Sequence, residues 1–133
     1  MRKLLLVTFF VAAVFSTAPA QSQVNSSQNT DEIPNMGRAP QQPDGIGRLD
    51  LRVVDAQGNP IKGVRADLQS HRSDGFLCES WNWTNARGVA VLPPIHMGRL
   101  TLTLKAKGFE TQKLEIDPST LNQPVRVTLA AKK

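Results

Sequence analysis

A period-two alternation of apolar and polar residues constrains the fold of this chain more than any other feature. Residues 49–53 read LDLRV, residues 100–106 read LTLTLKA and residues 125–129 read VRVTL. Such alternation places one face of a β-strand in a core and the other face in water. Six runs show this pattern and a seventh is a candidate: 49–53, 64–68, 89–92, 100–106, 112–116 and 125–129, with 77–83 as the candidate. No stretch after residue 45 has a sustained helical period.

Turn-forming residues separate these runs. Residues 56–60 read AQGNP, residues 85–88 read NARG, and further Gly or Pro residues follow the later runs. Glycine supplies positive φ and proline presets φ, so such clusters mark turns. About seven short strands with frequent turns predict a sandwich or a barrel. Because one sheet alone would leave an apolar face in water, the pattern predicts an all-β, seven-stranded antiparallel sandwich of two sheets.

The first 20 residues have the organisation of a secretory signal peptide. A basic start, MRK, precedes an apolar run over residues 4–15 that only Thr8 interrupts, and small residues stand at Ala18 and Ala20. This order of charge, apolar core and small residues is the signature of a cleaved signal. The apolar run is shorter than the roughly 20 residues that a membrane-spanning helix needs. We therefore expect cleavage after Ala20, no stable membrane span afterwards, and a secreted or periplasmic protein, with an uncleaved anchor as the alternative.

A polar segment follows the predicted signal peptide. Residues 21–44 are dominated by Gln, Ser, Asn and Pro and contain no aromatic residue, so they bury too little apolar surface to order themselves. We predict a disordered linker over 21–44 and one β-sandwich domain over 45–133. That domain has thirteen basic and eight acidic side chains, but the basic residues are scattered singly. Nucleic-acid binding requires a clustered basic patch, so no nucleic-acid partner is expected.

Several turn motifs occur in a recognisable order. Residues 53–64 read VVDAQGNPIKGV, residues 84–90 read TNARGVA, Gly98 precedes a strand, and residues 106–109 read AKGF. Together they resemble the carboxypeptidase regulatory-like domain, a transthyretin-like (prealbumin-like) fold, over most of residues 47–116. The resemblance implies an immunoglobulin-like or prealbumin-like sandwich and a non-catalytic module, often in exported bacterial proteins. It implies no particular ligand.

The chain offers few groups for catalysis. It has no tyrosine, one cysteine, Cys78, and two histidines, His71 and His96. Intradiol dioxygenases share a similar core and bind iron through two tyrosines and two histidines, a set that this chain cannot supply. A metal site needs three or four converging ligands, and no short spacing here provides them. We predict no catalytic, cofactor-binding or metal-binding residues, two solvent-facing histidines and a buried Cys78, against the weaker alternative of a hydrolase that uses Cys78 or a histidine.

Trp81 and Trp83 are the candidate ligand-binding residues. They stand two apart on the candidate strand 77–83, so both side chains point to the same face. One interpretation is an aromatic platform of the kind found in carbohydrate-binding sandwiches. The other is a contribution to the core, which the usual burial of tryptophan favours for at least one of the two.

These observations predict an exported, non-enzymatic binding or structural accessory module. Its partner would be a protein or a polysaccharide outside the inner membrane. A small carbohydrate-binding domain that uses the Trp81/Trp83 region is the alternative.

Overall fold

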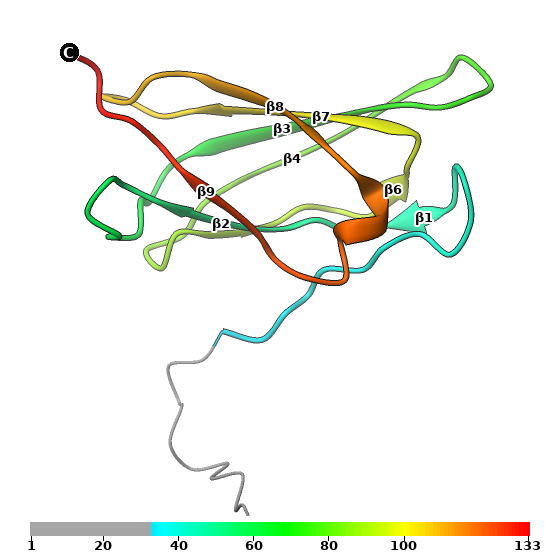
Figure 1. The fold of residues 1–133 in the computed structure, drawn as a ribbon, viewed down its shortest axis with the longest axis horizontal. Coiled ribbons are helices and arrows are strands. Elements are labelled where there is room, and N and C mark those ends of the chain that lie inside the picture. The colour runs from blue at the N-terminus through cyan, green and yellow to red at the C-terminus, as the bar shows by residue number, and fades with distance from the viewer. Residues whose placement is uncertain (1–32) are drawn as a thin grey trace, which may run out of the picture. The chain divides into compact units, whose positions relative to one another are not determined.

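The computed structural model of the chain describes residues 33–133 (Figure 1). The predicted signal peptide and the first part of the predicted linker lie outside the described residues. No helix long and apolar enough to cross a membrane occurs between Ile33 and Lys133.

The described residues form three sheets. The largest has the strand order β4 (Leu77–Trp83), β3 (Arg65–His71), β7 (Arg99–Lys105) and β8 (Gln112–Ile116). The second has the order β5 (Val89–Val91), β2 (Asp50–Val54) and β9 (Val125–Thr128). The third is a short pair, β1 (Ile46–Gly47) and β6 (Ile95–His96), and a 3-10 helix, η1 (Pro118–Thr120), precedes β9.

The prediction of an all-β fold is confirmed, and a strand forms at each of the seven predicted runs. The predicted number of strands is wrong, because residues 33–133 form nine. The additional strands, β1 and β6, have two residues each, which is too few for an alternation to be visible. A fully antiparallel arrangement is also wrong, because β2 and β9 pair in parallel, with Leu51 opposite Val125.

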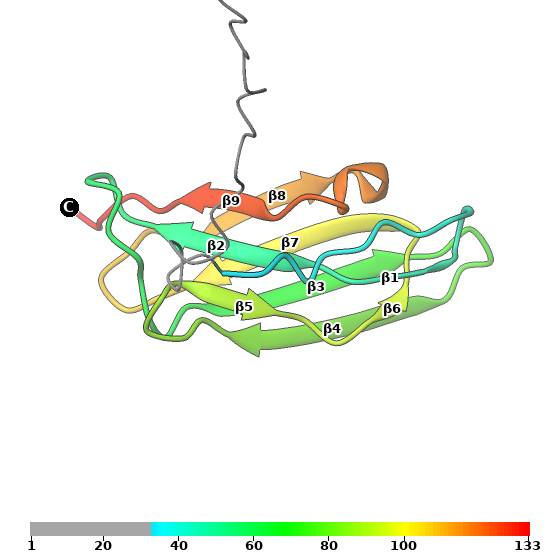
Figure 2. The same ribbon diagram turned by 90° about the horizontal axis from the view of Figure 1, so that it is seen from below.

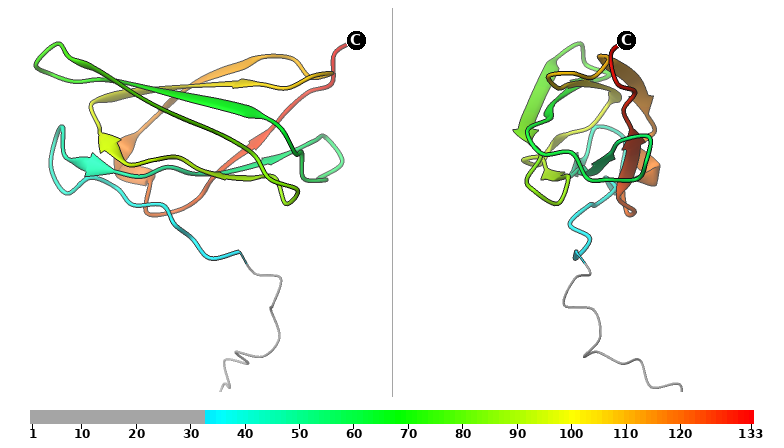
Figure 3. Two further views of the ribbon diagram at one scale, coloured as in Figure 1. Left: turned by 180° about the vertical axis from the view of Figure 1, so that it is seen from behind. Right: turned by 90° about the vertical axis from the view of Figure 1, so that its left-hand side faces the viewer.

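The two larger sheets lie in two layers around one core (Figures 1 and 2). Leu51 and Val53 project from β2, and Leu68, Leu102 and Leu104 project from β3 and β7, all of them 0–1% exposed. Burying each such side chain contributes about 1.5–3 kcal/mol before entropy is counted. Figure 3, which shows the layers from behind and end-on, makes clear that the four-stranded sheet has one face on this core and one face turned outward.

A buried ion pair holds the beginning of the described chain against the three-stranded sheet. Asp50 is fully buried, and its carboxylate accepts hydrogen bonds from Arg52 Nε and from Met36 N–H, both at 2.8 Å. The Arg52 guanidinium also donates to the carbonyl oxygens of Ile33 and Pro34, at 3.4 and 3.2 Å. These contacts satisfy both buried charges, as buried ion pairs require.

Further hydrogen bonds continue along this segment. Arg38 and Arg48 exchange backbone hydrogen bonds at 2.9 and 2.8 Å, and the Asn122 side chain accepts from Ala39 N–H at 2.9 Å. The compact unit therefore begins at Ile33 rather than at Gly45. The boundary predicted from composition lies at residue 45, because composition could not reveal partners that the folded domain supplies to residues 33–44.

Candidate functional site

The outer face of the four-stranded sheet carries the two tryptophans. Strand β4 forms an edge of this sheet and pairs only with β3, with Trp83 opposite Arg65 and Trp81 opposite Asp67. Trp81 is 51% exposed and Trp83 is 50% exposed. The prediction that both share one face is confirmed, and the interpretation that places at least one of them in the core is wrong.

The opposite face of β4 shows why the tryptophans are not in the core. Ser80 donates from Oγ to the Pro93 carbonyl oxygen at 2.7 Å, and Asn82 donates from Nδ2 to the Val91 carbonyl oxygen at 2.8 Å. These polar side chains tie the edge strand to β5 and the segment that follows it. Ser80 and Asn82 point inward, and alternate residues of a strand point to opposite faces, so both indoles point outward.

Arg65 joins the two indoles into one unit. Its guanidinium carbon lies 4.3 Å from the ring centroid of Trp81 and 5.4 Å from that of Trp83. Asp67 accepts a hydrogen bond from the same guanidinium at 3.0 Å, and this bond fixes the orientation of the guanidinium. Cation–π contacts at exposed sites contribute about 0.5–1 kcal/mol each. We call Arg65, Asp67, Trp81 and Trp83 the aromatic surface.

Most of the exposed large hydrophobic side chains in the described part of the chain lie on the aromatic surface or beside it. Six large hydrophobic side chains between residues 33 and 133 are well exposed, and four of them belong to β4 or the hairpin turn before it. Besides the tryptophans these are Phe76 and Leu77, at 68% and 50% exposure. An apolar strip of this kind on one edge strand is typical of an interaction site.

A polar hollow of about 430 Å³ lies farther along the same outer face. Its lining comes from three adjacent strands and includes Gln69, Thr101, Lys113 and Glu115. Gln69 also contacts Glu79 of β4, from Nε2 to Oε1, at 3.3 Å. The outer face thus combines flat aromatic rings at one end with hydrogen-bonding side chains beside them.

The structure does not bring Cys78 and the histidines together. His71 is exposed on the outer face of β3, whereas Cys78 is half-buried on the inward face of β4, opposite Ser70 in register. His96 is exposed, and its Nδ1 lies 2.9 Å from the Asp44 carbonyl oxygen. The two histidines face solvent as predicted, and Cys78 is less buried than predicted because β4 is an edge strand. Across residues 33–133, no group of three or more His, Cys, Asp or Glu side chains could hold a metal ion.

The sequence did not identify Arg65 and Asp67 as part of the candidate site. Their residue types suggested only a solvated face of a strand, and their role depends on the cross-strand register with β4. An alternation of charged and apolar residues carries no information on which strand lies alongside, so no signal in the sequence identified them.

Comparison with known proteins establishes the fold type only. No protein-family model and no curated protein matches the chain. Among solved structures, the chain is similar to 3-chlorocatechol 1,2-dioxygenase from Rhodococcus opacus 1CP, with a TM-score of 0.51 and 14% sequence identity. The match covers 64% of this chain and 59% of the dioxygenase chain. At this identity, the two proteins share an arrangement of strands, and the likeness carries no information on activity.

Proposed function

We propose that this protein is an exported, non-enzymatic binding module with a prealbumin-like sandwich, and that the aromatic surface on β4 is its ligand-binding surface. The observation that carries the proposal is the exposure of Trp81 and Trp83, each about half, on one face of an edge strand. Tryptophan is costly to leave in water and enriched at binding hot spots, so an exposed pair held by Arg65 favours a ligand.

The arrangement of strands supports the prealbumin-like assignment. The two larger sheets contain four and three strands, which together account for the seven strands that the resemblance implies. The short β1–β6 pair is an addition at one end. The turn motifs agree with the resemblance as well, because Gly58 and Gly88 both have positive φ in turns that flank β2 and β5.

Among ligand classes, a carbohydrate fits this surface best. Sugar rings present flat apolar C–H faces and a rim of hydroxyl groups. The indole rings offer apolar area, while Asp67, Gln69 and Thr101 on the neighbouring strands offer hydrogen-bonding groups on the same face. A site of this composition takes a ligand that is both flat and polar.

Replacing both tryptophans, Trp81→Ala and Trp83→Ala, tests the proposal. Each half-exposed indole contributes about 1 kcal/mol to stability or less, mostly through Arg65. We expect the double variant to melt within a few degrees of the parent, and to lose about 30-fold or more in affinity for the polysaccharide that the parent binds in a panel. Differential scanning calorimetry and affinity electrophoresis measure the two quantities.

Ile46→Ala is the matched control, because Ile46 is equally exposed, at 50%, but lies on β1 outside the aromatic surface. It should leave binding unchanged. A double tryptophan variant that melts far below the parent, with no polysaccharide bound by either protein, would show that the indoles only pack the edge strand and would refute the proposal.

The export part of the proposal has its own test. The signal peptide predicts a mature N-terminus at Gln21, because cleavage follows Ala20. Intact-mass spectrometry of the protein from its native host should therefore give the mass of residues 21–133. A protein that retains residues 1–20 contradicts cleavage.

A further inference from the structure

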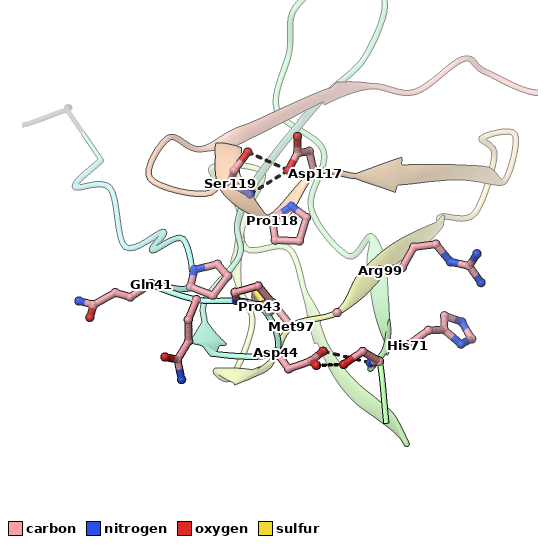
Figure 4. Close-up of a pocket in the computed structure, with 13 residues that line it drawn as sticks. Gln41, Pro43, Asp44, His71, Met97, Arg99, Asp117, Pro118 and Ser119 are labelled. Carbon is pink, nitrogen blue, oxygen red and sulfur yellow. Dashed lines mark hydrogen bonds between the residues drawn. The ribbon is translucent and has the colours of Figure 1, made fainter. Parts of the chain in front are cut away.

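A second hollow lies at one end of the fold, away from the tryptophans. Its walls come from four segments that are distant in sequence: residues 40–44, 71–73, 97–99 and 117–119 (Figure 4). Its volume is about 600 Å³. Sites for small organic ligands typically measure about 300–1,000 Å³, so this hollow is large enough for one.

The centre of this end hollow is apolar. Pro43, Met97 and Pro118 line it from three different segments, as Figure 4 shows, and Pro40 lines it as well. Met97 is 2% exposed and forms a packed floor. Proline rings and a thioether offer no hydrogen bonds, so this part suits the hydrocarbon body of a ligand.

Two donor side chains, His71 and Arg99, stand at the edge of the end hollow, where they also line the polar hollow on the outer face of the four-stranded sheet. They are directly opposite each other on β3 and β7, and both are exposed. Neither side chain makes a hydrogen bond or an ion pair with any other residue in the range 33–133, whereas Arg52, Arg65 and Arg72 each pair with an aspartate. An arginine fork of this kind is suited to a carboxylate or another planar anion.

The carboxylates around the end hollow, in contrast, already have partners. Asp44 accepts from Ser73 N–H at 3.2 Å and from the Ser73 hydroxyl, and Asp117 accepts from Ser119 N–H at 2.9 Å and Ser119 Oγ at 2.8 Å. Hydrogen bonds from these serines lower the pKa of both carboxyl groups. Of the charged side chains that line the end hollow, Arg99 is therefore the one left without a partner among residues 33–133.

Close packing holds the end hollow in place before any ligand arrives. Met97 N–H donates to the Gly45 carbonyl oxygen at 2.9 Å, and Gly98 N–H donates to Ser70 Oγ at 2.8 Å. Asp44 adopts φ 60°, a conformation rare for residues other than glycine, and such conformations concentrate at ligand sites. A preformed site loses little entropy on binding.

We propose that this end hollow is a second ligand site, separate from the aromatic surface, which takes a small carboxylic acid with an apolar ring or branched body. The carboxylate pairs with Arg99, and His71 lies beside it as a second donor. The apolar body lies against Pro43, Met97 and Pro118.

Titration with benzoate and cyclohexanecarboxylate, followed by NMR of the Met97 methyl group and the Gly98 amide, tests this site. We expect saturable shifts at both positions with millimolar dissociation constants, because a fragment of this size forms few contacts. Benzylamine and benzyl alcohol should shift them weakly or not at all. Arg99→Ala should weaken acid binding about tenfold or more, as the loss of a charged hydrogen bond predicts.

Arg126→Ala is the matched control, because Arg126 is an exposed arginine on β9 that does not line this hollow. It should leave acid binding unchanged. Absence of saturable shifts up to about 10 mM acid, the upper end of fragment affinities, would overturn the proposal. So would equal shifts with benzyl alcohol, or an equal loss in Arg126→Ala. The Trp81→Ala, Trp83→Ala variant should retain acid binding, so this site and the aromatic surface can fail independently.

Discussion

Asp50→Ala is expected to lower the free energy of unfolding by about 3–5 kcal/mol, which is the effect of breaking a buried ion pair from one side. Asp50 is fully buried, and the Arg52 side chain is only 11% exposed. Without the carboxylate, the guanidinium keeps its charge in a largely dry site and Met36 N–H loses its acceptor. Urea denaturation monitored by tryptophan fluorescence measures the change.

The same substitution should loosen the segment before β1. Arg52 holds the carbonyl oxygens of Ile33 and Pro34 only while Asp50 orients its guanidinium. Limited proteolysis of the variant should therefore cut near Met36 faster than in the parent, before the strands are digested.

Asp67→Ala is the control for this prediction. The Arg65–Asp67 pair is 35% and 38% exposed, and exposed pairs contribute about 0–1 kcal/mol. If the two aspartate variants lose the same stability, the buried pair does not hold the segment and the prediction is wrong.

Lowering the pH should destabilise the parent protein and so reproduce part of the effect of Asp50→Ala. Burial raises the pKa of Asp50, but hydrogen bonds from Arg52 and Met36, together with the positive charges of Arg52 and Arg126, outweigh it, so the pKa lies below its ordinary value of 3.8. A lowered carboxyl pKa contributes stability that is present above the unfolded-state pKa and is lost as the pH falls through the folded-state pKa. The parent should lose this contribution below about pH 4, and Asp50→Ala should lack it.

Gly88→Ala is the second substitution with a large expected effect, about 2–5 kcal/mol, which sums a backbone and a packing contribution. Gly88 has φ +74°, where an L-residue costs about 1–2 kcal/mol. A Cβ there would also collide with the Val53 carbonyl oxygen and lie 3.0 Å from Pro60 Cβ, and overpacking of this kind costs about 1–3 kcal/mol. Since the Gly88 carbonyl oxygen accepts from Val53 N–H at 2.8 Å, the collision falls where β5 joins β2.

Gly58→Ala separates the two contributions. Gly58 has φ +85°, but a Cβ added there would meet no atom within 4 Å, so only the backbone contribution applies. Thermal unfolding should place Gly58→Ala between the parent and Gly88→Ala. Equal destabilisation of both variants would show that packing at Gly88 contributes nothing.

Local patterns in the sequence were enough to locate the longer strands and most of the turns. Alternation located six of the seven strands of the two larger sheets, because a strand with one buried face must place apolar side chains at every second residue, and residues 77–83 were the candidate for the seventh. Gly58, Gly88 and Gly108 mark turns in the sequence and have positive φ in the structure, because glycine alone adopts that conformation without strain.

The position of the candidate site, in contrast, depends on contacts that only the folded chain makes. Neither face of residues 77–83 is uniformly apolar, so alternation could not choose which face is buried. Inward hydrogen bonds from Ser80 and Asn82 made that choice and left Trp81 and Trp83 outside. Contacts of this kind join residues distant in sequence, and a local periodicity carries no information about them.

The burial of Asp50 has the same origin. In the sequence it is the polar member of an alternating strand, which predicts a solvent-facing side chain. It is buried because Arg52 and Met36 converge on its carboxylate, and Met36 belongs to a segment whose composition predicted disorder. A polar residue can occupy a dry position only when such partners are present, and composition alone does not reveal which segment supplies them.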